Sequence, residues 1–146
     1  MSILIGYQYP TREELPSARG FCEWAIDPDT RDVIRPVRLV YGAEAIRIRL
    51  AHRMRFWYGE NFLDTREGMR YREFVLVRSP DRRVVKHLFR RCILSTRGIA
   101  SVDRLDLTID NATRHGLITF EALCVTGATL VANREPFIVP SDTRYQ

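Results

Sequence analysis

The sequence predicts an α+β fold in which two helices pack on a small antiparallel sheet, with an extended N-terminal arm. Two adjacent segments in the middle of the chain repeat their apolar residues with a helical period, and the segments after them alternate apolar and polar residues like strands. The chain has 146 residues, of which 45% are hydrophobic and 28% charged, as expected for one packed domain. We therefore expect an arm over residues 1–36 and a single α+β domain over residues 37–146.

The arm is rich in turn-forming and charged residues, which is typical of irregular structure. Phe21 and Trp24 are large apolar side chains near its end, and we expect them to anchor the arm on an apolar surface. Val37–Val40 is a short extended run before Gly42, and we interpret it as a strand.

A first helix is predicted from about Ala43 to Tyr58, with Gly59 ending it. Its apolar residues form one stripe at helical spacing: Ile46, Leu50, Met54 and Trp57. The other faces carry cationic side chains: Arg47, Arg49, His52, Arg53 and Arg55. The loop over residues 60–68 keeps large apolar residues, so we expect it to pack against the domain.

A second helix has clear start and stop signals. Ser79 suits the N-cap, Pro80 the first helical position, and Gly98 the left-handed stop. Its apolar stripe consists of adjacent apolar pairs that recur every four residues: Val84 and Val85, Leu88 and Phe89, and Cys92 and Ile93.

The C-terminal third is predicted to form strands. Residues 104–110 and 118–124 each alternate between apolar and mostly polar positions, and the Asp110–Gly116 segment between them is rich in turn formers. These segments predict an antiparallel hairpin. A last strand is expected around residues 130–131 and 137–139.

Positive charge is concentrated in the middle of the chain. The 23 basic residues comprise 22 arginines and Lys86, and the net charge is +5. Residues 44–91 hold 13 basic and 6 acidic residues. Such a surplus is compatible with nucleic acid or an acidic protein surface as partner, and also with a coding bias towards arginine. Composition alone does not separate these interpretations.

Sequence motifs for cofactors or metals are missing. The three cysteines are widely spaced, so we interpret them as free buried thiols, and the three histidines form no metal-ligand pattern. We expect no cofactor and no metal. The longest apolar runs are too short to span a bilayer, and residues 1–10 do not resemble a signal peptide.

Two functional alternatives have some basis in the residues. Glu60 and Asp64 lie four positions apart beside aromatic residues, a spacing compatible with a carboxylate pair that cleaves glycosides, or with turn-capping residues. The Arg47–Tyr58 segment interleaves arginines and aromatics, which can suit phosphate contacts and base stacking. Neither pattern comes with a specific motif, so we favour the structural interpretation of both.

Several blocks of the sequence resemble a family of bacteriophage tail proteins. The blocks follow one another in the family's order: Val40–Ile46, Arg53–Glu60, Phe62–Tyr71, Arg90–Ile99, and the Val102, Leu105 and Leu107 positions. They match a "G-x-EAI" helix that leads into "GE-x-FLD…G-x-Y", and then a helix before a "GV-x-x-V" strand. The family is similar to the baseplate wedge protein of contractile tails, which some descriptions label lysozyme-like, and is related to a baseplate component of type VI secretion systems.

The resemblance implies a non-enzymatic subunit of the tail baseplate. We expect it in the virion after assembly in the bacterial cytoplasm, with several copies in a ring. Its partners would be wedge subunits, the sheath and tube-proximal proteins, with neither nucleic acid nor a membrane as partner. The better-known wedge proteins carry a Glu-Pro-Arg contact motif where this chain has Ser95-Thr96-Arg97, so only the arginine is retained. The candidate partner-binding residues are Arg97, Arg90, Arg91, Arg53, Arg55, Trp24 and Phe21.

Overall fold

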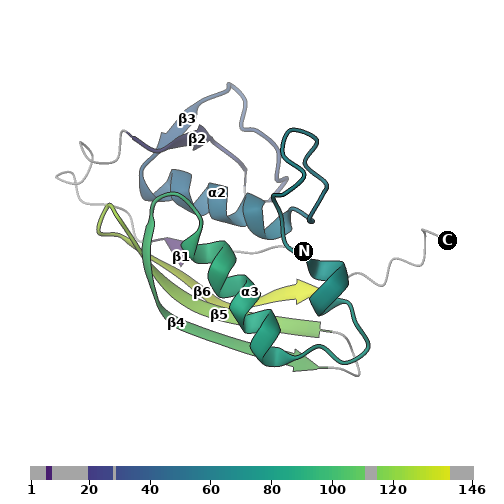
Figure 1. Ribbon diagram of the computed structural model, residues 1–146. Helices are drawn as coiled ribbons and strands as arrows, with labels where there is room; N and C mark the ends of the chain where they lie inside the picture. Colours follow the sequence, from purple (N-terminus) through teal and green to yellow (C-terminus); the bar gives the residue numbers. More distant parts are fainter. Residues whose placement is uncertain (1–5, 8–19, 28, 111–114, 139–146) are drawn as a thin grey trace.

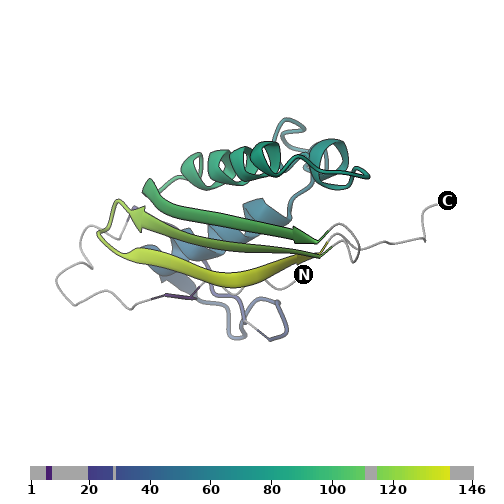
Figure 2. The same cartoon turned by 90° about the horizontal axis from the view of Figure 1, so that it is seen from below.

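The computed structural model describes residues 6–7, 20–27, 29–110 and 115–138, and it has the α+β architecture that the sequence predicts (Figure 1). Helices α2 (Ala43–Arg55) and α3 (Arg82–Leu94) lie on the same face of a four-stranded antiparallel sheet. The opposite face of this sheet is left uncovered by the helices (Figure 2). The prediction of two helices on one small sheet is confirmed.

The four-stranded sheet has the order β1-β6-β5-β4. Its strands are β1 (Gly6–Tyr7), β4 (Ile99–Asp110), β5 (His115–Cys124) and β6 (Thr129–Ile138). The β4–β5 pair confirms the predicted hairpin, and β6 is longer than the expected last strand because it pairs with β5 from Thr129 to Ile138. The turn residues 111–114 and Val139 lie outside the described residues.

A second, two-stranded sheet joins β2 (Cys22–Trp24) to β3 (Leu39–Tyr41). The strand predicted over Val37–Val40 therefore begins two residues later. Two pieces of the predicted arm, β1 and β2, are strands, and its residues 1–5, 8–19 and 28 lie outside the described part. The division into an arm and a domain stays a prediction.

Helix α2 lies between the two sheets (Figure 1). Its predicted stripe is fully buried at Ile46, Leu50 and Met54, and residues on other faces, such as Ile48, are buried as well. The helix ends at Arg55 rather than Tyr58 because Phe56 turns to an extended conformation. The backbone of the next residues then pairs with Met69 instead of continuing the helix.

Helix α3 begins later than predicted. Asp81, not Ser79, is the N-cap, and its carboxylate accepts a hydrogen bond from the backbone N–H of Arg83 at 2.8 Å. The helix ends at Leu94, so Gly98 is not the stop residue but a positive-φ residue in the turn before β4. A Cβ atom at Gly98 would lie 2.6 Å from the side chain of Ile46, so glycine allows this turn to pack closely on α2.

A short π-helical turn, η1 (Tyr71–Val75), connects the loop after α2 to α3. The buried Tyr71 hydroxyl donates a hydrogen bond to the carbonyl oxygen of Met54 at the end of α2. Burial strongly raises the pKa of this hydroxyl. Tyr71 and Phe89 then meet edge to face, so the turn is tied to both helices.

Candidate assembly surfaces

Arg53, a predicted contact residue, lies at the junction of the two helices and is bound within the chain. Its guanidinium reaches from α2 to the C-terminal end of α3 and donates hydrogen bonds to the carbonyl oxygen of Ser95, to the Ser95 hydroxyl at 3.1 Å and to the Thr96 hydroxyl at 3.5 Å. The last carbonyls of a helix carry partial negative charge, so a cation there is stabilising. A partner would have to compete with these acceptors for Arg53.

Arg49 is also bound within the chain. Its Nε lies 2.7 Å and its Nη2 2.5 Å from Glu23 Oε1, and both side chains are about a quarter exposed. The pair ties α2 to β2. The sequence analysis missed Glu23 because its partner lies 26 positions away, on a strand within the predicted arm.

Arg97 and Phe21, two other predicted contact residues, lie against each other. The guanidinium carbon of Arg97 is 5.7 Å from the centre of the Phe21 ring, and the ring packs on the core. Phe21 therefore anchors this segment on the apolar core, which agrees with the expectation that it packs on an apolar surface. Arg97 stays exposed beside the Arg53 junction, so these three candidate residues gather at the C-terminal end of α3.

Arg55 is half-buried and lacks a full set of partners. Its Nε is buried without a hydrogen-bond acceptor among the described residues. Burial, and then the nearby Arg31, lower the pKa of Arg55. Burial, followed by the charge of Arg55, also lowers the pKa of His52, while Glu23 acts in the opposite direction. The C-terminal part of α2 thus holds more positive charge than its surroundings neutralise.

The outer face of α3 differs from α2. Arg83 and Arg91 are exposed, and within the described ranges no acceptor lies within hydrogen-bonding distance of their side chains. His87 is exposed midway between them, and these three positions, four residues apart, lie along one side of the helix. Val84 and Leu94 are exposed apolar residues of the same helix. This face combines free cations with apolar area, a composition suited to an acidic protein surface.

Strand β4 is an outer strand of the sheet, paired only with β5 in the part of the chain that the structure describes. Two arginines of α3 reach its backbone: Arg82 Nη2 lies 2.5 Å from the Leu107 carbonyl oxygen, and Arg90 Nη2 lies 3.4 Å from that of Val102. An outer strand offers backbone groups to another strand, and side chains that cover it limit unwanted pairing. Arg90, a predicted contact residue, is therefore placed at this strand.

Trp24 lies on the outward face of the two-stranded sheet and is 54% exposed. The register pairs it with Leu39 and pairs Cys22 with Tyr41, so these four exposed side chains share one face. Aromatic residues presented in this way are common in protein interfaces. The prediction that Trp24 binds a partner is compatible with this position.

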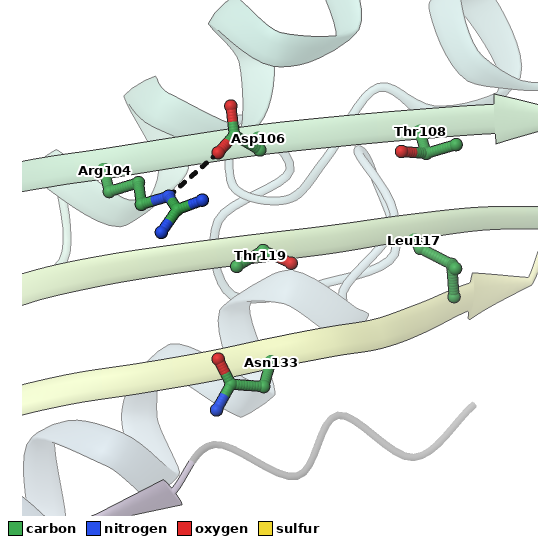
Figure 3. A pocket seen from close by; sticks show the side chains of 6 residues that line it. All are labelled: Arg104, Asp106, Thr108, Leu117, Thr119 and Asn133. Carbon is green, nitrogen blue, oxygen red and sulfur yellow. Dashed lines mark hydrogen bonds and ion pairs between the residues drawn. The ribbon is translucent and has the colours of Figure 1, made fainter.

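The uncovered face of the four-stranded sheet has a shallow depression of about 510 Å³ (Figure 3). It is lined by side chains of three strands: Arg104, Asp106, Thr108, Leu117, Thr119 and Asn133. Arg104 Nε lies 3.0 Å from Asp106 Oδ2, and Lys86 reaches the same carboxylate at 4.0 Å. Five of the six lining residues are polar or charged, and the two charged ones, Arg104 and Asp106, pair with each other.

The two carboxylates of the candidate pair, Glu60 and Asp64, each accept hydrogen bonds from groups in or next to their own loop. The Glu60 carboxylate accepts a hydrogen bond from the backbone N–H of Trp57 at 3.0 Å. Asp64 pairs with Arg66, and hydrogen bonds from the Arg66 side chain and backbone lower the pKa of Asp64. A glycosidase acid needs a raised pKa. This geometry favours the turn-capping role for both residues.

The three thiols are unpaired, as predicted, but Cys22 is exposed rather than buried because it lies on the outward face of β2. Burial raises the pKa of Cys92 and of Cys124 to about 11. Among the described residues there is no cluster of three potential metal ligands. Nor does the described part contain a helix that is long and apolar enough to cross a membrane.

Sequence reasoning missed two further features of these surfaces. Arg83 belongs to the free face of α3, and its signal was the four-residue spacing to His87 and Arg91. The loop over residues 60–68 was expected to pack, but Phe62 and Leu63 point into solvent. Hydrogen bonds within the loop and at its base shape it, and composition does not reveal them.

Residues 22–127 match the profile of a protein family described as the contractile injection system sheath initiator. The match covers more than half of the chain and includes both helices, the two-stranded sheet, and β4 and β5. Comparison with functionally curated proteins finds no match.

Proposed function

The chain belongs to the contractile injection system sheath initiator family, structural baseplate proteins that start sheath assembly, and we propose that it starts the sheath at strand β4 while α3 holds it in the baseplate. As a sheath initiator it interacts with sheath and baseplate proteins. The finer proposal is that this baseplate is that of a bacteriophage tail and that several copies lie in a ring beside wedge subunits and tube-proximal proteins. The resemblance of the sequence blocks to tail wedge proteins supports it.

The observation that carries the proposal is the position of β4 at the end of the sheet order. Its 12 residues make it the longest strand in the described part of the chain. A strand from another subunit can add to such an edge through backbone hydrogen bonds, with little dependence on side-chain identity. An incoming strand would displace or avoid the hydrogen bonds that Arg82 and Arg90 make to β4 carbonyls.

The exposed face of α3 supports the other part of the proposal, namely that this helix holds the protein in the baseplate. Arg83 and Arg91 have no acceptor among the described residues, and guanidinium groups pair well with carboxylates of a partner. Modest contacts of this kind combine when several copies bind around a ring. We propose that Arg91, Arg97 and Trp24 contribute to these contacts, and that Arg53 acts mainly in the fold.

Amide hydrogen exchange tests the role of β4. The protein is measured alone and bound to the purified sheath protein of the same particle. Strand addition should slow exchange at several amides of residues 99–110 by about tenfold or more, because new hydrogen bonds protect them. Amides of β5 are the control, since both neighbours of β5 are already present. Sheath binding that leaves β4 exchange unchanged would refute strand addition.

A further inference from the structure

The loop over residues 60–68 presents two large apolar side chains to solvent, against expectation. Phe62 is 87% exposed and Leu63 is 81% exposed, the two highest exposed fractions among the large hydrophobic residues in the described part of the chain. Figure 1 shows the loop between α2 and η1 projecting away from the four-stranded sheet. Single exposed apolar residues are common on protein surfaces, but two adjacent ones at a loop tip suggest a binding element.

The base of this loop is fixed to the core. The backbone N–H of Met69 donates to the Phe56 carbonyl at 2.8 Å, and that of Tyr58 donates to the Met69 carbonyl at 3.0 Å. The Met69 side chain is buried. Gly68 has φ +109°, and a Cβ atom there would lie 2.5 Å from the Trp57 carbonyl oxygen, so only glycine allows the two ends of the loop to approach this closely.

The tip is held by its own polar groups. Asn61 accepts a hydrogen bond from the Leu63 N–H at 3.0 Å, and the Asp64 carbonyl accepts one from the Glu67 N–H at 3.1 Å. The Asp64 carboxylate accepts another from the Arg66 N–H at 3.0 Å. A loop held in this way loses little conformational entropy when it binds, so Phe62 and Leu63 are preorganised for contact.

The loop is also acidic in an otherwise basic chain. It contains three acidic residues and one arginine, for a net charge of −2, whereas the whole chain carries +5. The arginine, Arg66, lies 3.1 Å from Asp64, so the remaining negative charge belongs to Glu60 and Glu67. A partner that complements the loop therefore needs an apolar pocket bordered by basic side chains.

We propose that residues 60–68 form an apolar knob that inserts Phe62 and Leu63 into a basic-rimmed apolar pocket of a different baseplate protein. The inference rests on the proposed baseplate location and adds a contact that neither β4 nor α3 makes. A second copy of this chain is a poorer match, because the depression that its described residues form on the sheet is lined mostly by polar and charged side chains, including an Arg104–Asp106 ion pair. The fit of Phe62 and Leu63 in the pocket would fix the orientation of the protein in the baseplate. The acidic side chains of Glu60 and Glu67 would favour a pocket with a basic rim.

The test replaces both knob side chains, Phe62→Ser with Leu63→Ser, in cells that make the particle and lack their own copy of the protein. The melting temperature of the purified variant should match that of the wild type, because both side chains are exposed. The amount of variant in purified baseplates should fall by about tenfold or more, as for the loss of an interface hot spot. Val125→Ser, which also removes an exposed apolar side chain, is the matched control and should leave incorporation unchanged.

A photo-crosslinking amino acid at position 62 identifies the occupant of the contact in assembled baseplates. The expected adduct joins position 62 to another baseplate protein, at a peptide with apolar residues flanked by lysine or arginine. Normal incorporation of the double variant, or an adduct to a second copy of this chain, overturns the knob but leaves the proposed function intact. Wild-type protein missing from baseplates would instead overturn the proposed function and the knob together.

Discussion

Two arginines of α2 and two of α3 have different surroundings, although both helices are 13 residues long and rich in the same cation. On α2, Arg49 binds Glu23 and Arg53 binds the end of α3. On α3, Arg83 and Arg91 point outward with no acceptor in the part of the chain that the structure describes. The cause is position: α2 is covered on two sides by sheets, whereas α3 is covered on one side (Figure 1).

This difference separates these four arginines into two functional classes. Arg49 and Arg53 of α2 bind carboxylate, carbonyl and hydroxyl groups of the fold, so they are unavailable to a partner without a cost to stability. Arg83 and Arg91 of α3 are exposed and hydrated and contribute little to folding, so a partner can bind them at low cost, whereas Arg82 and Arg90 of the same helix bind carbonyl groups of β4. A basic segment of sequence is therefore not equivalent to a basic surface.

Arg53→Met should give the largest loss of stability. It removes the charge-assisted hydrogen bonds to Ser95 and Thr96, and we expect a loss of about 2 kcal/mol in the free energy of unfolding. Urea denaturation measures this value. Arg91→Met is the matched control from the exposed class, and its effect should stay within about 0.5 kcal/mol. Equal losses for the two variants would abolish the distinction between the helices.

Arg49→Met should have the next largest effect, a loss of about 1 kcal/mol, because it leaves the half-buried Glu23 without its cation. A double-mutant cycle with Glu23→Gln isolates the pair. We expect the two losses to be less than additive. Strictly additive losses would show that the ion pair contributes nothing to stability.

Arg55→Met should change stability in the opposite direction. The Nε of Arg55 is buried without an acceptor, and Arg31 repels its charge, so an apolar side chain of similar length removes two unfavourable features. We expect a gain of up to about 1 kcal/mol in the same urea experiment. A loss as large as that of Arg53→Met would show that Arg55 has a stabilising partner in the folded protein.

The smallest effect is a pH dependence from His52. Its pKa is lowered from the usual value of 6.5, chiefly by burial and then by Arg55. The unfolded chain therefore takes up this proton at a higher pH than the folded protein, so stability falls as the pH drops through about 6.5. Thermal unfolding at pH 7.5 and 5.5 should show a smaller difference for His52→Gln than for the wild type. An unchanged difference would assign the pH dependence to other groups.

The periodicity of the sequence predicted the fold well where one face of an element is buried. The stripe at Ile46, Leu50 and Met54 and the alternation around Leu105 and Ile118 both correspond to buried positions. The ends of elements were less predictable, because they depend on tertiary hydrogen bonds. Met69, for example, pairs with Phe56 and ends α2 before the glycine that the sequence suggested.

The candidate surfaces were only partly predictable. Arginine type and spacing identified the basic helices, but the acceptors Glu23 and Ser95 lie far away in sequence from the arginines that they bind. Long-range pairs of this kind leave no local pattern, so Arg53 and Arg91 look alike in the sequence. The exposure of Phe62 is hidden for the same reason, since apolar residues in a loop usually indicate packing.

Charge reversal on α3 tests most directly the central claim that Arg83 and Arg91 serve assembly, whereas Arg49 and Arg53 of α2 serve the fold. The variant Arg83→Glu with Arg91→Glu is compared with the wild type for melting temperature, for the amount bound to purified baseplates, and for sheath assembly on those baseplates. We predict a melting temperature close to that of the wild type and a loss of baseplate binding by about tenfold or more. A stable variant that enters baseplates and starts sheaths as well as the wild type would contradict this account.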